Sequence, residues 1–490
     1  MKNSIKNNIR VKWWLVIIAL LMSSCSDFLK EDPQNVVAQT NYYQNEKDAI
    51  SAVNSIYAWL GSYDFTYGNT AGIYHSTFWI TQGLASDEMN NNQLGAPDLD
   101  QLATFSYNSE NGAILEIWKM HYKAIYVANI AIDRIPSIDM DPTLRSRLVN
   151  EAKFLRGLLY FNLVRMFGQV PLLTSEDEPL TPKVSTTDEI YAQVIKDLTD
   201  AENLPDSYPA GNGLGRATSG AAKALLAKVY LTKGEYQKCA DITQEVINSG
   251  RYQLWSNYSD VFKLSSRNGK EAIFSVGFGD ADGAISFWEV GQFNVRLLPA
   301  ELSRDIPEIT NTQGWQVATQ NLYDSYSSAD SRKDVNFMTQ FNKPDGSTVN
   351  LDKIYFQKYW DKEADPTAGG SENDFPVLRY ADVLLMDAEA NAQLGNFSTA
   401  NTYLNMVRNR ANLSDVDITS KDAFISEVLS ERRKEFACEG QRWFDLVRTQ
   451  KLIEKVQAAK GITPGEEYKL FPIPLRERDL NPNLPQNPGF

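Results

Sequence analysis

The sequence predicts a mainly α-helical protein in which helix pairs form a scaffold and a large, loop-rich insert carries a few short strands. Three observations support this fold class: amphipathic helical patterns recur along the chain, one helix–turn–helix pattern occurs twice, and the segment between its two copies is rich in turn residues. The 490 residues are 43% hydrophobic and 11% aromatic, which suffices for a large core and excludes general disorder.

Four segments in the first 205 residues have the spacing of amphipathic helices: 45–62, 112–135, 144–168 and 186–204. The third is expected to end at Gly168. The fourth opens with Thr186 followed three residues later by Glu189, which is the pattern of a capping box. Each segment combines a polar face with an apolar stripe, as helices that stack on one another require.

Residues 222–250 and 383–412 share one spacing pattern around a central glycine. The aligned pairs are Gly234 with Gly395, Ala227 with Ala388, Tyr236 with Phe397, and Cys239 with Ala400. Each copy reads as a helix, a glycine turn and a second helix with a small residue where the two helices cross. This resembles the tetratricopeptide pattern of paired helices, although any helical hairpin is the alternative.

The segment between the two copies, 252–375, has a different texture. It is rich in turn residues, and "EAIFSVGF" (271–278) and "DKIYFQKYW" (352–360) predict short strands. Loops held on a rigid scaffold commonly carry binding residues. We therefore expect the ligand-binding face in this insert.

The N-terminus has the pattern of a lipoprotein signal. Four basic residues and no acid precede a ten-residue apolar run at 13–22, which is too short to span a membrane as a helix. Ser23, Ser24 and Cys25 then resemble a bacterial lipobox, although Met22 replaces the usual leucine. We expect a signal peptide at 1–24, a lipid on Cys25 and a polar tether at 25–41; a secreted protein with a stray cysteine is the alternative.

Charge and cysteine content exclude several classes of function. The net charge of −14 becomes −18 without residues 1–24, which disfavours binding to nucleic acid or anionic headgroups. Cys239 and Cys438 form no disulfide framework, and two buried thiols are expected, with one bridge as the alternative. The loop "GDADG" (279–283) has Gly291 where a calcium loop needs its twelfth-position acid. No metal and no cofactor are therefore expected.

Long C-terminal motifs carry a family resemblance. "ISEVLSERRKEFACEGQRWFDLVRTQKL" (425–452) and "YKLFPIPLRERDLNPNLPQNPGF" (468–490) closely resemble the SusD/RagB family of surface lipoproteins from Bacteroidetes-type bacteria. Other segments agree, including "CSDFLKEDPQ" at the mature start and "EAKFLRGLLYFNLVRMFGQVPLL" (151–173). The resemblance covers essentially the whole mature chain, which we divide into an N-terminal helical region at 42–251, the insert at 252–375 and a C-terminal region at 376–490.

The resemblance implies a function as well as a fold. Such proteins capture nutrient, usually oligosaccharide, at the outer face of the outer membrane and deliver it to a TonB-dependent SusC-like transporter. The resemblance thus implies a non-enzymatic, lipid-anchored protein with an oligosaccharide ligand and a transporter partner. A tetratricopeptide-type surface adaptor that binds peptide or protein is the alternative.

Candidate ligand-binding residues are aromatic side chains that could stack on a sugar ring and amides that could bind its hydroxyls. The resemblance implies that such residues come from an early loop and from the middle of the chain, so it points to regions rather than to single residues. Packing under a long loop is the structural alternative for each aromatic. The candidates are Phe287, Trp288, Trp315, Asn91, Asn92 and Gln93.

Hydrolysis has less support, because two histidines offer little for a Ser-His-Asp triad or a histidine-rich metal site. Paired carboxylates among the 62 acids stay open as an alternative, since the sequence does not show their distances. Asp87 and Glu88 are adjacent acids that need not converge on a substrate. In the C-terminal region, Arg432 with Glu435, Glu439 with Arg442, and Arg442 with Asp445 are spaced for pairing on a helix. We expect them to form a partly buried latch; a solvated charged face is the alternative.

Overall fold

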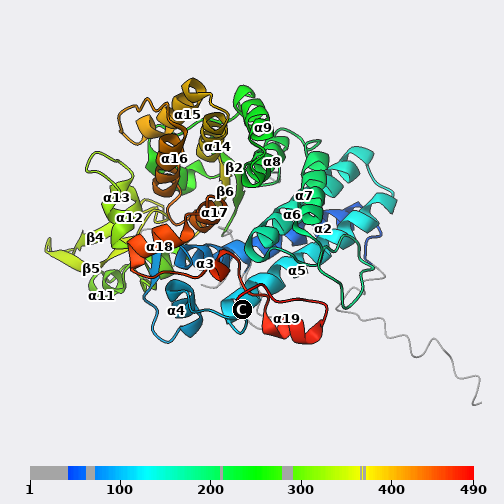
Figure 1. Ribbon diagram of the computed structural model, residues 1–490, viewed down its shortest axis with the longest axis horizontal. Helices are drawn as coiled ribbons and strands as arrows, with labels where there is room; N and C mark the ends of the chain where they lie inside the picture. Colours follow the sequence, from blue (N-terminus) through cyan, green and yellow to red (C-terminus); the bar gives the residue numbers. More distant parts are fainter. Residues whose placement is uncertain are drawn as a thin grey trace, which may run out of the picture. The chain divides into compact units, whose positions relative to one another are not determined.

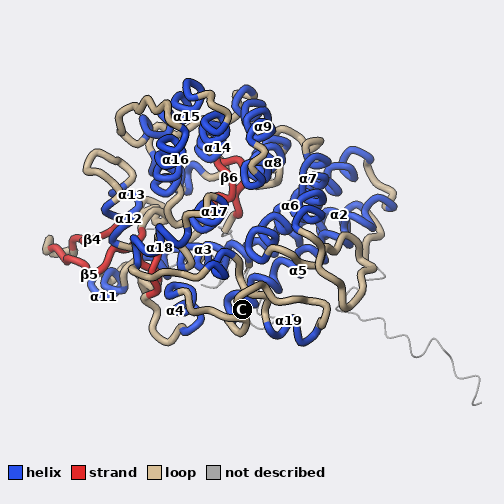
Figure 2. The backbone as a smooth tube through the Cα atoms, viewed as in Figure 1, coloured by secondary structure: helices blue, strands red, loops and turns tan. Residues whose placement is uncertain are grey.

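Helices dominate the structure, which confirms the predicted fold class (Figures 1 and 2). A computed structural model describes residues 42–61, 72–209, 213, 215–278, 291–364, 367 and 371–490. Residues 45–490 belong to one unit, to which the description below refers. The elements before the insert are α2 (Glu46–Gly61), η3 (Ile73–Thr77, a π-helix), α3 (Phe78–Leu84), β1 (Met89–Asn91), α4 (Pro97–Thr104), α5 (Gly112–Arg134), η4 (Ile135–Ser137), α6 (Pro142–Phe167), α7 (Thr187–Ala201), α8 (Ser219–Lys233) and α9 (Tyr236–Asn248).

Local sequence signals set the ends of several of these helices. Helix α7 begins with the predicted capping box, in which the Glu189 backbone N–H donates to the Thr186 hydroxyl and the Glu189 carboxylate accepts from the Thr186 backbone N–H at 2.8 Å. Helix α6 ends at Gly168, as predicted, with a positive φ of 72° that favours glycine. These ends are predictable because the groups that satisfy them lie within one turn of the chain.

The insert contains most of the strands. Its elements are η5 (Tyr258–Phe262), η6 (Leu264–Ser266), β2 (Ala272–Val276), α10 (Phe293–Leu297), α11 (Ala300–Asp305), β3 (Gln316–Ala318), α12 (Gln320–Asp324), α13 (Lys333–Asn336), β4 (Phe337–Asn342), β5 (Thr348–Phe356) and β6 (Phe375–Arg379). The two strands predicted from sequence are present as β2 and β5. The sheets are antiparallel: one has the order β1–β3–β5–β4, and β2 pairs with β6.

The C-terminal region returns to the helical scaffold. Its elements are α14 (Tyr380–Gln393), α15 (Phe397–Arg410), α16 (Lys421–Glu435), α17 (Arg442–Arg448), α18 (Leu452–Lys460), η7 (Glu466–Lys469) and α19 (Leu475–Leu480). Successive helices pack in the order α5, α6, α7, α8, α9, α14, α15, α16. Because α9 packs directly on α14, the scaffold is continuous in space although the insert interrupts it in sequence (Figure 1).

The two copies of the predicted repeat are helix pairs α8–α9 and α14–α15. Gly234 and Gly395 lie in the turns with φ of 74° and 85°, a conformation that costs glycine little. The small residues Cys239 and Ala400 are fully buried. The thiol of Cys239 faces the α14 backbone, so a small residue is needed where α9 meets α14. Cys239 and Cys438 are both free, buried thiols, as expected.

The C-terminal charges form a buried network, but the predicted pairings within the helix are wrong. Arg432 forms ion pairs of 2.8 Å with both Asp382 and Asp445. Glu435 accepts hydrogen bonds from the guanidinium groups of Arg332 and Arg379. The partners come from other elements, because helix α16 is packed on several sides and its charges must be neutralised by whatever faces them.

Glu439 and Arg442 also pair with residues from other elements. Glu439 pairs with Lys358 at 2.8 Å and with Arg379 at 2.9 Å, and Arg442 pairs with Asp87 at 2.8 Å. These contacts join the N-terminal part, the insert and the C-terminal helices. The latch is therefore more deeply buried than the sequence predicts, and it connects all three parts of the chain.

Candidate ligand-binding site

The strand pair β1–β3 brings the early polar segment next to Trp315. Asn91 is opposite Gln316, and the Asn92 backbone N–H donates to the Trp315 carbonyl oxygen at 2.7 Å. Residues more than 220 positions apart are thus neighbours, as the side-chain bond from Asn92 Nδ2 to the Gly314 carbonyl (2.8 Å) also shows. Of the sequence-predicted residues, four therefore lie together: Asn91, Asn92, Gln93 and Trp315.

Gly314 allows the chain to turn before Trp315. Its φ is 61°, and a Cβ atom there would lie 2.4 Å from the Tyr355 ring. The same loop is held to α10 by a hydrogen bond from the Gln313 backbone N–H to the Val295 carbonyl at 2.8 Å. Trp315 is therefore supported by rigid backbone on both sides, although it lies outside regular structure.

A pocket of about 420 Å³ lies beside this strand pair. Its wall is built from η3, α3, residues 93–99, the start of α5, and α10 with the residue before it. The lining mixes polar and apolar residues. The apolar side chains are Ile80, Ala96, Pro97, Leu99 and Ala113. The polar and charged lining side chains are His75, Ser76, Thr77, Thr81, Gln93, Asp98, Glu116, Gln292 and Arg296.

Arg296 joins the pocket to Trp315. Its guanidinium carbon lies 5.0 Å from the centre of the Trp315 ring, which is a cation–π contact. Burial lowers the pKa of Arg296 to about 10, and the Glu116 carboxylate opposes that shift. Its Nε atom is buried and has no hydrogen-bond partner within the described part of the chain. The pocket thus contains the desolvated guanidinium of Arg296, whose Nε–H is available to donate a hydrogen bond to a ligand.

The three predicted amides have different surroundings. Asn92 Nδ2 donates to a backbone carbonyl, and Asn91 Nδ2 donates to the Asp100 carboxylate at 2.7 Å. Asn92 therefore helps to hold the strand pair together, and Asn91 ties β1 to α4. Gln93 lines the pocket, and its Oε1 atom is buried without a partner among the described residues. A buried, unpaired acceptor is costly unless a ligand or water satisfies it.

Comparison with known proteins decides the family. A sequence model of the SusD family matches residues 309–490, and a second model, described as "Starch-binding associating with outer membrane", matches residues 27–231. The chain belongs to the SusD/RagB family. The predicted resemblance is therefore confirmed.

Relatives align along nearly the whole of this SusD/RagB chain. A SusD-like protein of Formosa agariphila is 29% identical over 96% of this chain and 97% of its own length. The starch-binding protein SusD of Bacteroides thetaiotaomicron is 24% identical, with 86% of each chain covered.

Solved structures agree. A SusD superfamily protein from Parabacteroides distasonis has a TM-score of 0.79 and 26% identity, covering 91% of this chain and 99% of its own. A laminarin-binding SusD-like protein has a TM-score of 0.78 and 27% identity, and the match covers 91% of this chain and 100% of that protein.

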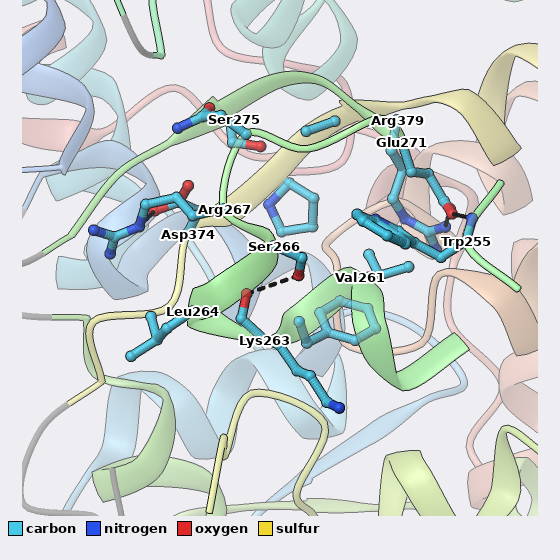
Figure 3. Close-up of a pocket in the computed structure, with 14 residues that line it drawn as sticks. Trp255, Val261, Lys263, Leu264, Ser266, Arg267, Glu271, Ser275, Asp374 and Arg379 are labelled. Atoms are coloured by element: carbon cyan, nitrogen blue, oxygen red, sulfur yellow. Dashed lines mark hydrogen bonds and ion pairs between the residues drawn. The ribbon is translucent and has the colours of Figure 1, made fainter. Parts of the chain in front are cut away.

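A second cavity of this SusD/RagB protein is lined by residues of the insert and of β6 (Figure 3). Its volume of about 30 Å³ has room for about one water molecule. Glu271 and Arg379 in its wall bond to each other at 3.0 Å, and the Trp255 backbone N–H donates to Glu271. Because its charged walls satisfy one another and its space is small, we do not assign a ligand to it.

Three predicted positions, Cys25, Phe287 and Trp288, lie outside the described residues, as does the loop at 279–283. Within the described ranges, no group of three or more acidic, histidine or cysteine side chains could hold a metal ion. None of the helices in those ranges has the length and apolar character that crossing a membrane requires.

Sequence reasoning missed Arg296 and Glu116. Nothing in "GQFNVRLL" or "ILEIWK" distinguishes these charges from the many others in the chain. Only the packing of α10 against β3 and the position of α5 place them in the same pocket. A signal that could have drawn attention to Arg296 is its spacing of four from Gln292, which puts both on one face of a short helix.

Proposed function

We propose that this chain is a cell-surface lipoprotein that binds oligosaccharide and delivers it to a TonB-dependent transporter of the SusC type. The observation that carries the proposal is the pocket in which Gln93 Oε1 is a buried acceptor and Arg296 Nε a buried donor, neither with a partner among the described residues. Relatives named for binding starch and laminarin support an oligosaccharide ligand.

The pocket chemistry suits a sugar. A hydroxyl group can donate to Gln93 Oε1 and accept from Arg296 Nε, so two hydroxyls of one ring could satisfy both atoms. Ile80 and Leu99 offer apolar contact to the C–H face of the ring. Trp315 fixes Arg296 in place, and its half-exposed ring can add stacking area. Phe287 and Trp288 remain predicted contacts.

The proposed role is binding without hydrolysis. Asp87 and Glu88, the acids considered for catalysis, are each 1% exposed, and neither lines the pocket. Asp87 is bound to Arg442 through both carboxylate oxygens at 2.8 and 3.0 Å. Oligosaccharide incubated with the protein should therefore be recovered at its original length by chromatography; shorter products that persist in repurified protein would contradict this.

Isothermal titration of residues 26–490 against an oligosaccharide panel tests the binding claim. Arg296→Ala should weaken binding by about tenfold or more, because a lost hydrogen bond to a charged group is worth about 1.5–3 kcal/mol. Gln93→Ala and Trp315→Ala should each weaken it by about threefold to tenfold, because a neutral hydrogen bond or an aromatic contact is worth about 0.5–1.5 kcal/mol. Trp59→Ala is a matched control, since Trp59 is half-buried on α2 and outside the pocket lining.

The same panel tests the predicted contact at Trp288, where Trp288→Ala should also weaken binding. Pocket variants that bind as tightly as wild type would overturn the proposed site. A panel that never binds would overturn the proposed ligand class while leaving the family assignment intact.

The anchor and the partner have separate tests. Mass spectrometry of the native protein should show a diacylglycerol-type modification at residue 25, and Cys25→Ala should move the protein from the membrane fraction to the soluble fraction. Affinity purification of the native protein should recover an outer-membrane barrel protein. An unmodified Cys25 or purification without a barrel would contradict the respective part of the proposal.

A further inference from the structure

The charges in the pocket allow the ligand class to be narrowed. Among the described lining residues, Arg296 is the only lysine or arginine, whereas Asp98 and Glu116 are both carboxylates. Apart from His75, the other polar lining side chains are amides and hydroxyls. The pocket therefore has no excess of positive charge, and the chain as a whole is strongly acidic.

Each carboxylate lies beside positive charge or a positive dipole. Glu116 faces the buried Arg296 closely enough to raise the pKa of the guanidinium against the effect of burial. Asp98 lies at the N-terminus of the long helix α5: its Oδ2 would be 2.6 Å from a Cβ atom on Gly112, the first residue of that helix. The positive end of a helix dipole favours a carboxylate there.

We propose that this pocket selects uncharged glycans and that Glu116 is the residue that excludes acidic ones. This inference rests on the proposed function. A uronate or sulfate group entering the pocket would meet the like charges of Glu116 and Asp98 in a partly desolvated space. To reach Arg296, it would also have to displace the interaction that Glu116 already makes with that guanidinium. Sugar hydroxyls carry no charge, so they meet neither the repulsion nor this displacement. They can bond to Gln93 Oε1 and Arg296 Nε, which have no partner among the described residues.

The experiment compares matched ligands by isothermal titration of residues 26–490. Maltohexaose and laminarihexaose are each compared with their C6-carboxylated forms, so that chain length and linkage stay constant. Wild type should bind a neutral hexasaccharide at least about tenfold more tightly than its acidic form. Raising the salt concentration to about 1 M should narrow that ratio, because screening weakens like-charge repulsion.

Glu116→Gln should lower the ratio of neutral-ligand to acidic-ligand affinity by about tenfold, because the substitution leaves the Arg296 charge available to the ligand. Glu110→Gln removes an exposed carboxylate just before α5 that does not line the pocket, and it should leave the ratio as in wild type. Asp98→Asn provides a second, independent variant if Glu116→Gln does not fold, and it should shift the ratio in the same direction.

The outcomes separate the two proposals. Equal or tighter binding of the acidic forms by wild type, or an unchanged ratio in both pocket variants, would overturn the selection against anions while leaving glycan binding intact. Absence of binding to either ligand form by wild type would overturn glycan binding by this pocket, and with it this inference.

Discussion

Replacing Asp87 with asparagine should destabilise the protein strongly, because Asp87, two residues before β1, joins this segment to the buried C-terminal charge network. Its carboxylate accepts from Arg442 at 2.8 and 3.0 Å and pairs with Arg433 at 3.1 Å, and it is almost fully buried. The Asp87→Asn variant would remove the carboxylate that pairs with two buried guanidinium groups. Breaking a buried ion pair in this way typically costs about 3–5 kcal/mol.

The pKa of Asp87 gives a second estimate. Burial alone would raise this pKa, but Arg442 and Arg433 lower it from 3.8 to about 2. This lowering of the pKa corresponds to about 2.5 kcal/mol of stability above pH 4. Because the folded-state pKa is depressed, that stability is present above pH 4 and is lost as the pH falls toward 2. The two estimates together predict a loss of about 3 kcal/mol at neutral pH.

Denaturant unfolding of residues 26–490 at several pH values measures this loss. The difference between wild type and Asp87→Asn should be about 3 kcal/mol at pH 7 and should shrink between pH 4 and pH 2. Asp352→Asn is the control, because Asp352 is largely exposed and its contact with Lys353 is long at 3.6 Å; it should change stability by less than about 0.5 kcal/mol. A loss below about 1 kcal/mol at pH 7, or one that does not vary with pH, would refute the reasoning.

Three further predictions concern the stability of the protein and the turn before β3. Burial and the Asp87 charge raise the pKa of Glu88 to about 8, so the folded state keeps a proton that the unfolded state releases above pH 4.5. Wild type should therefore lose stability as the pH rises from 4.5 to 8. In thermal melts, Glu88→Gln should remove this dependence of stability on pH. Gly314→Ala should destabilise by about 1–3 kcal/mol and weaken oligosaccharide binding, because its Cβ would collide with Tyr355; wild-type affinity would contradict the account of this turn. Cys239→Leu should cost about 1–3 kcal/mol in denaturant melts by overpacking the crossing of α9 and α14, and an unchanged midpoint would show that the crossing has spare room.

The scaffold could be predicted because its signals are local. The capping box at Thr186 and the glycine turns at Gly234 and Gly395 are completed by groups within a few residues, so spacing in the sequence is enough to reveal them. The strands β2 and β5 are likewise predictable because residues typical of strands lie between turn-rich segments in both.

The site could be predicted only in part. The segment 91–93 and Trp315 were identified as candidates by residue type, but their pairing across β1 and β3 is a long-range contact that spacing does not reveal. The roles within the segment also depend on tertiary partners, since Asn92 donates to backbone whereas Gln93 lines the pocket. For the same reason, the partners of Arg432 were predicted wrongly: they lie on α14 and α17 rather than one turn away.

A crystal structure of residues 26–490 with a bound oligosaccharide tests the central claim most directly. We predict a sugar ring in the pocket between α3, α4 and α10, with one hydroxyl within hydrogen-bond distance of Gln93 Oε1 and another within that distance of Arg296 Nε. A sugar bound elsewhere on the protein, with both of these atoms left unpaired, would contradict the account.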